Sequence, residues 1–191
     1  MGIMIEYWQR IISMTPQQLL AQGIVVIIML LTAWNGQAKK QNNFILIILI
    51  VNILNVVQYA LLSAHTASLV TGLCIFRNIT FFIYKRKDEN KDIPLWILLI
   101  FFATIIIASI LTWESWISMT AMFGILTFSY GIWQKDIKIT KVMSIVSDAC
   151  WIIHGIYYLA IMDIVKIIIG TSSMLIWFFR ESKKEKIKTS N

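Results

Sequence analysis

Hydrophobic residues gather into seven long runs that are separated by short polar segments. The runs are Gln18–Trp34, Phe44–Ser63, Thr66–Tyr84, Leu95–Thr112, Trp116–Trp133, Lys141–Ala160 and Asp163–Arg180. Each is long enough to cross a hydrocarbon core of about 30 Å as a helix rising about 1.5 Å per residue. The pattern therefore predicts an all-α integral membrane protein with seven transmembrane helices.

The segment before the first run has a helical pattern of its own. Apolar residues recur at helical spacing between Ile3 and Ile12, which predicts a short interfacial helix within residues 1–15, lying on the outer membrane surface. Thr15-Pro16 then has the form of an N-cap followed by proline at the first helical position. Tryptophans near the predicted span ends are typical of interfacial anchors. They are Trp34, Trp96, Trp113, Trp116, Trp133 and Trp177.

Basic residues are distributed unequally between the two sides of these runs. Fourteen of the 17 Lys and Arg residues follow the first, third, fifth and seventh runs, whereas Arg10 and Lys166 lie on the other side and Arg77 lies inside a run. Basic loops stay cytoplasmic. The charge pattern therefore predicts an outer N-terminus and a cytoplasmic C-terminus.

Composition supports a single membrane domain. Charged residues make up 14% of the chain and hydrophobic residues 58%, whereas a soluble domain carries about 25% charged residues. The net charge of +7 is explained by loops that lie close to anionic lipid heads. We therefore expect a lipid bilayer as partner and no nucleic acid.

The first three runs resemble the last three. A shift of 96 residues places Asn52 on Asp148, Asn55 on Trp151 and Gln58 on His154. Two copies separated by one span would be parallel repeats. The predicted organisation is two three-helix bundles joined by a linker helix (3+1+3). Its parts are 16–85 for the first bundle, 93–113 for the linker helix, 115–181 for the second bundle and 182–191 for a cytoplasmic tail.

Three stretches carry a resemblance to a known family. They are Ala21-Gln22-Gly23, Arg77-Asn78 with its surroundings, and Cys150-Trp151-Ile152-Ile153-His154. Across about residues 18–182 the chain resembles the YgjV-like family of bacterial inner-membrane proteins, within the SWEET-like superfamily (MtN3/PQ-loop/nicotinamide riboside carrier). The resemblance implies a 3+1+3 fold in the bacterial cytoplasmic (inner) membrane. The chain departs from the wider superfamily in one respect. Its only prolines are Pro16 and Pro94, so neither repeat has a Pro-Gln dipeptide or a mid-helix proline hinge, and a proline-dependent gate is not expected.

Ionisable and amide residues inside the runs are candidates for a solute site, because polar groups at membrane depth are costly and are usually functional. Asn52, Arg77 and Asp148 lie at similar distances from the predicted inner ends of their spans, and we expect Arg77 and Asp148 to form an ion pair. The predicted substrate-binding residues are Asn52, Asn55, Gln58, Arg77, Asn78, Asp148, Trp151 and His154.

Structural alternatives exist for the same residues. Arg77 and Asp148 can serve only to hold helices together, and the asparagines can make interhelical hydrogen bonds. His154 can be a proton-linked group or a packing residue. An Arg77 in contact with Asp148 would keep the carboxylate ionised, which favours a facilitator over a proton symporter.

Enzymatic motifs are not found in the sequence, and Cys74 and Cys150 are interpreted as apolar filler, so we expect neither an enzyme nor a cofactor or metal. The predicted function is a facilitator for a small polar solute, such as a sugar, nucleoside or vitamin, that works by alternating access. A non-transport receptor or assembly protein of the same fold is the alternative. Assembly into a homo-oligomer is left open.

Overall fold

The structure is a computed structural model that describes residues 15–62, 65–87, 93–113, 115–157 and 161–189. The described residues form seven helices and no strand. These are α2 (Pro16–Gly36), α3 (Gln41–Leu61), α4 (His65–Lys87), α5 (Leu95–Leu111), α6 (Ser118–Trp133), α7 (Ile137–Tyr157) and α8 (Ile161–Thr189). The predicted all-helical class is confirmed, whereas the predicted interfacial helix lies almost entirely outside the described residues.

The start of α2 follows the predicted capping chemistry. Thr15 is the N-cap and Pro16 occupies the first helical position. The Thr15 hydroxyl accepts from the Gln18 backbone N–H over 3.3 Å, and the Gln18 side chain accepts from the Thr15 N–H over 2.9 Å. This capping box satisfies two backbone donors that would otherwise be free at the helix start.

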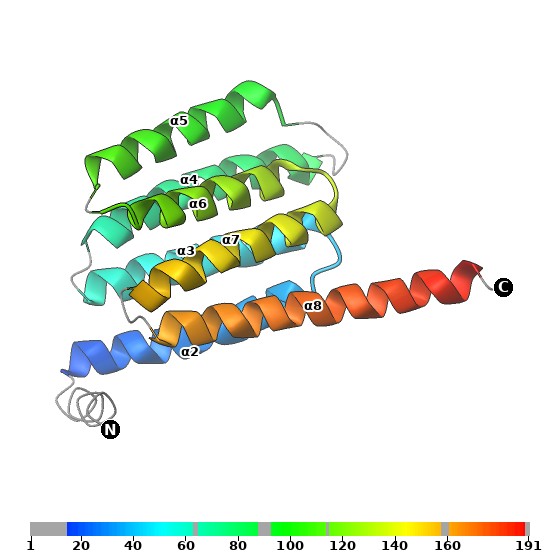
Figure 1. Ribbon diagram of the computed structural model, residues 1–191, viewed down its shortest axis with the longest axis horizontal. Coiled ribbons are helices and arrows are strands. Elements are labelled where there is room, and N and C mark those ends of the chain that lie inside the picture. Colours follow the sequence, from blue (N-terminus) through cyan, green and yellow to red (C-terminus); the bar gives the residue numbers. More distant parts are fainter. Residues whose placement is uncertain (1–14, 63–64, 88–92, 114, 158–160, 190–191) are drawn as a thin grey trace.

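Figure 1 shows α2, α3 and α4 side by side, α6, α7 and α8 side by side, and α5 at one edge; the first and second three are called the first and second unit. In the first unit, α2–α4, helix α3 packs against both α2 and α4. In the second unit, α6–α8, helix α7 packs against both α6 and α8. Helix α2 also packs against α8, and α5 packs against α6 and α4. In Figure 1 the second unit lies in front of the first.

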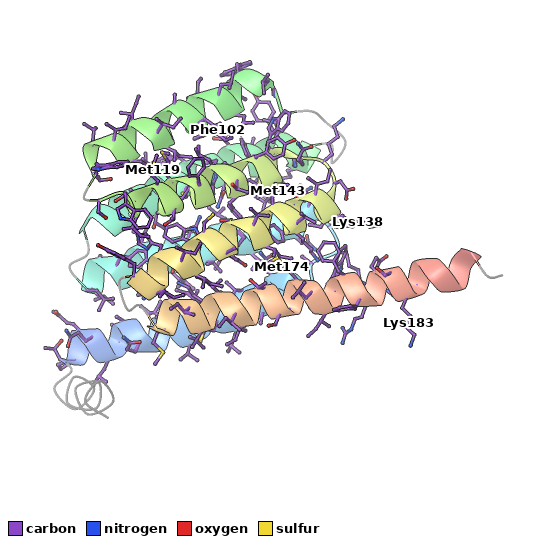
Figure 2. The ribbon with its side chains drawn as sticks, in the orientation of Figure 1. Phe102, Met119, Lys138, Met143, Met174 and Lys183 are labelled. Carbon is purple, nitrogen blue, oxygen red and sulfur yellow. The ribbon has the colours of Figure 1, made fainter. Side chains whose placement is uncertain are left out.

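One end of the bundle collects the basic connections. Figure 1 shows the α2–α3 and α6–α7 connections and the C-terminal part of α8 at the same end, opposite the start of α2. Lys138 and Lys183 both lie there in Figure 2. We call this the basic end, formed by residues 36–41, 85–87, 133–141 and 177–184. The start of α2 and the end of α8 lie at opposite ends of the bundle (Figure 1).

Large apolar side chains cover much of the outer surface. Leu30 on α2 is 68% exposed, Leu111 on α5 is 81% exposed and Phe179 on α8 is 75% exposed. Four helices of the described residues, α2, α3, α7 and α8, are long and apolar enough to cross a membrane, and α5 is a shorter apolar helix. Such apolar surface is expected where helices contact lipid.

The apolar core lies between the two units, near the basic end. Phe44 and Ile45 of α3, Phe81 of α4, Ile132 of α6 and Met174 of α8 belong to one buried cluster. Figure 2 shows Met174 where α8 faces the rest of the bundle. The core therefore joins residues from both units into one packed layer.

Glycine permits the closest helix approach beside this core. A Cβ at Gly36, the last residue of α2, would lie 2.6 Å from Ser173 Oγ and 2.9 Å from the backbone N of Met174. No side chain fits at that distance, so glycine lets α2 reach the backbone of α8.

Candidate functional site

The carboxyl end of α6 is held by side chains of the first unit. The Lys85 ammonium donates to the carbonyl oxygen of Ile132 over 2.9 Å and also to that of Gln134. The Gln41 amide donates to the same two carbonyls, over 3.3 Å each. Carbonyls at a helix end have no partner inside the helix and carry partial negative charge. A buried cation at this position therefore satisfies them.

The carboxyl end of α2 is held in the reciprocal way by the second unit. The Lys141 ammonium donates to the Gly36 carbonyl over 2.9 Å and lies 3.4 Å from the centre of the Trp177 ring. Thr140 adds a bond of 3.0 Å to the Gln41 side chain. We call this set, Gln41, Lys85, Thr140, Lys141 and the helix ends they hold, the basic-end seal.

Trp177 departs from its predicted place. It is only 6% exposed, so the prediction of an interfacial anchor is wrong for this residue. Its ring faces the Lys141 ammonium, a cation–π arrangement that partly replaces the water lost by that cation. Trp34, Trp96 and Trp116 are more than half exposed, as anchors should be.

Arg77 lies buried in α4 and contacts α6. Its Nε and Nη2 atoms donate to Asn78 Oδ1 over 3.2 and 3.1 Å, and its Nη1 donates to Ser129 Oγ over 2.6 Å. The guanidinium carbon lies 5.3 Å from the centre of the Phe128 ring. Arg77 thus links the two units through neutral groups.

The predicted ion pair between Arg77 and Asp148 is wrong. Asp148 Oδ2 accepts from the Thr171 hydroxyl over 2.5 Å, and the ion pairs found among the described residues are Lys166–Asp163 and Lys184–Glu181. Equal depth means only that the two residues lie at the same level along the bundle; it does not mean that their side chains face each other. Arg77 faces α6 and Asp148 faces α8, so the two charges do not meet.

Depth along the first unit can be measured from one contact. Asn42 Nδ2 donates to the Lys85 carbonyl over 3.1 Å, which places these residues of α3 and α4 at one level. Counting about 1.5 Å per residue from there, Arg77 lies about 12 Å from the basic end, Asn52 about 15 Å and Asn55 about 20 Å. These polar residues therefore rise stepwise away from the basic-end seal.

Several buried amides of the first unit have a side-chain atom without a hydrogen-bond partner. Three of them are predicted site residues, with the atoms Asn55 Oδ1, Gln58 Oε1 and Asn78 Nδ2, and Asn78 is completely buried; Asn35 Oδ1, near the end of α2, is a further such atom. Buried amide atoms are normally bonded, because an unsatisfied one costs about 1–3 kcal/mol. Asn52 is only half-buried. Three of the predicted asparagine and glutamine residues thus carry a buried polar atom that needs a further partner.

The predicted residues Trp151 and His154 lie together on α7. Their rings are 5.5 Å apart and nearly perpendicular. A Cβ at Gly124 of α6 would lie 3.1 Å from Trp151 Nε1, so the indole packs against α6 within its own unit. Gly124 therefore makes room for this ring.

Several site residues were missed because they were assigned to loops or to packing. Lys85 and Lys141 were counted as loop charges, although Lys141 is in phase with Ser144 and Asp148 along one helical face. Ser129 and Thr171 carried no signal of their own, since hydroxyls are common inside transmembrane helices. Extending the polar faces of α4 and α7 further toward the basic end would have included both lysines among the buried residues.

Comparison with known proteins agrees with this helical membrane architecture. The sequence model of the Imp-YgjV family, described as bacterial inner membrane protein, matches residues 19–185. No significant match was found among curated proteins or among solved structures.

Proposed function

Because the chain belongs to the Imp-YgjV family of bacterial inner membrane proteins, we propose that it carries a small polar solute across that membrane. The two three-helix units would rock against each other, with α5 as the linker of a 3+1+3 arrangement. The observation that carries this proposal is the group of buried amide atoms without partners, Asn55 Oδ1, Gln58 Oε1 and Asn78 Nδ2. A packing role alone would leave these buried atoms unsatisfied at a cost in stability. The hydroxyl groups of a solute would donate to the two oxygens, and a hydroxyl or carboxyl oxygen would accept from Asn78 Nδ2.

The basic-end seal supplies the other half of the proposed mechanism. Its hydrogen bonds join α3 and α4 to α6, and α7 to α2. Release of a solute at the basic end would require these bonds to break together. The described conformation is then the one closed toward the basic end, with the polar residues above the seal.

The orientation of the transporter follows from the positive-inside rule. We expect the basic end to be cytoplasmic, so that a reporter fused after Asn191 is cytoplasmic and one before Met1 is periplasmic. Fusions that place both ends on the same side would disprove seven spans and the parallel relation of the two units.

Uptake into proteoliposomes tests the function directly. Purified full-length protein should move at least one member of a panel of sugars, nucleosides, vitamins and small organic acids down its gradient. Asn55→Leu should abolish that uptake, whereas Ile53→Ala, at an exposed position on the same helix, should preserve it. Binding without uptake would favour the receptor alternative. Equal effects of the two variants would remove Asn55 from the site.

A further inference from the structure

We propose that the solute is a small organic carboxylate, and that Arg77 and Asn78 bind its carboxyl group. The inference concerns which solute binds, and it rests on the proposed function only for the step of translocation. Its starting point is a full positive charge inside the bundle with no negative charge beside it.

Arg77, Lys85 and Lys141 are buried cations that bind neutral acceptors, and of these three Arg77 lies farthest from the basic end and binds no helix-end carbonyl. Arg77 is 2% exposed, and within the described part of the chain no carboxylate lies within 4 Å of it. Lys166, by contrast, pairs with Asp163 at 2.7 Å. An isolated charge in a low-dielectric interior is costly unless an opposite charge joins it. Neutral acceptors and the Phe128 face compensate Arg77 only in part.

The geometry around the guanidinium is that of a carboxylate site occupied by an amide. Nε and Nη2 of Arg77 both donate to the single oxygen Asn78 Oδ1. In bidentate pairs this edge of the fork takes two carboxylate oxygens. The Asn78 Nδ2 donor remains without a partner. Rotation of the amide away from Arg77 would leave a group of N–H donors and no competing acceptor.

The space next to Arg77 limits the size of the solute. A cavity of about 120 Å³ lies between α4 and α5, and Arg77 and Cys74 line it together with Phe101, Thr104 and Ile105. Its walls are almost entirely apolar. The cavity would therefore take the short hydrocarbon body of the solute, and the carboxyl group would reach the guanidinium nitrogens only once the Asn78 amide has moved away from them.

The closing experiment compares short carboxylates with their amides on the purified full-length protein. Acetate, lactate and benzoate should raise the thermal unfolding midpoint in detergent with a saturable concentration dependence, at constant ionic strength. Acetamide, lactamide and benzamide should not raise it. Equal shifts for acids and amides would overturn the inference.

Asn78→Asp provides the sharpest variant, because it keeps the shape and adds an internal carboxylate at the Arg77 fork. We expect a higher midpoint without any solute, and an affinity for carboxylates lowered by about 10–100-fold, the worth of a charge-assisted bond. Arg77→Gln should lower the affinity similarly. Lys39→Gln removes an exposed cation at the basic end and should leave the affinity unchanged. An unaltered carboxylate affinity in Asn78→Asp would show that Arg77 only holds the helices together.

Uptake by the same preparations separates the two proposals. Carboxylate binding without uptake would disprove transport and leave the binding inference standing. Uptake of a neutral sugar or nucleoside, with no carboxylate binding, would overturn the inference and leave transport standing.

Discussion

The basic end of the bundle and its opposite half differ in their hydrogen bonds: at the basic end they join the two units, and in the opposite half they lie within one unit. At the basic end, hydrogen bonds join the two units at α2–α7, α2–α8, α3–α6, α3–α7 and α4–α6. Arg77 and Ser129 add the bond between units that lies farthest from that end. Beyond it, the hydrogen bonds among described residues stay within one unit, as between Asp148 and Thr171.

This difference separates structural polar groups from candidates for solute contact. Lys85 and Lys141 are buried cations whose acceptors are helix-end carbonyls, so their position is explained by packing and helix electrostatics. Asn55 and Gln58 are also buried, but they keep oxygen atoms without donors, as Asn35 does near the basic end. In the sequence, the two lysines and the two amide residues all stand out as polar residues in apolar helices. Only their hydrogen-bond partners in the structure distinguish the lysines from the amides.

The largest effect is expected from removing both lysines of the seal. Lys85→Met with Lys141→Met should lower stability by about 3–6 kcal/mol, because each lysine makes at least one charge-assisted hydrogen bond that contributes about 1.5–3 kcal/mol. Lys39→Met, at an exposed position, is the control and should leave the thermal midpoint unchanged.

The same double variant should also open the basic end. A cysteine placed at Ser129, in protein lacking Cys74 and Cys150, should react faster with an impermeant maleimide added from the basic side. If labelling and midpoint both stay at the control values, the lysines do not close this end.

A smaller loss of stability is expected at Gly36, where α2 closely approaches the backbone of α8. Gly36→Ala should destabilise by about 1–3 kcal/mol, because its Cβ would meet Ser173 and the Met174 backbone N below 3 Å. Gly23→Ala is the matched control on the same helix, with nothing within 4 Å of its Cβ. It should stabilise by about 0.5–1 kcal/mol, since alanine favours a helix more than glycine. Thermal midpoints in detergent measure both, and equal shifts would contradict the close packing of α2 on α8.

In the opposite half, the bond between Asp148 and Thr171 lies within the second unit. Thr171→Val should cost about 1.5–3 kcal/mol, near the low end because Asp148 is only half-buried and water can replace the hydroxyl. The loss should vanish in the Asp148→Leu background, which has no acceptor for the hydroxyl, if the bond is the cause. The basic-side labelling of a cysteine at Ser129 should not change. Faster labelling would mean that this bond also closes the basic end.

The smallest expected effect is the coupling between Arg77 and Asp148. Since the two side chains bind different partners on different helices, their separate neutralisations should add to within about 0.5 kcal/mol. A double-mutant cycle with Arg77→Gln and Asp148→Asn measures this. A coupling well above that value would restore the ion pair predicted from depth, and with it the argument for a permanently ionised Asp148.

The sequence alone determined the all-helical class, the helix positions and the clustering of basic connections at one end. Hydrophobic run length and capping residues are local properties, so Thr15-Pro16 predicted the start of α2 correctly. Helical rise likewise predicts the positions of Asn52 and Arg77 along the bundle from the sequence.

Only the tertiary structure decided which polar groups meet. Contact depends on how each helix is rotated about its axis and which helix lies beside it, and hydrophobic periodicity is weak evidence for either when both lipid and core are apolar. Rotation turned Arg77 toward Ser129 and Asp148 toward Thr171. Packing of α2 against α8 and α7 brought Gly36 to Lys141 across more than 100 residues of chain, a distance over which no local pattern carries information.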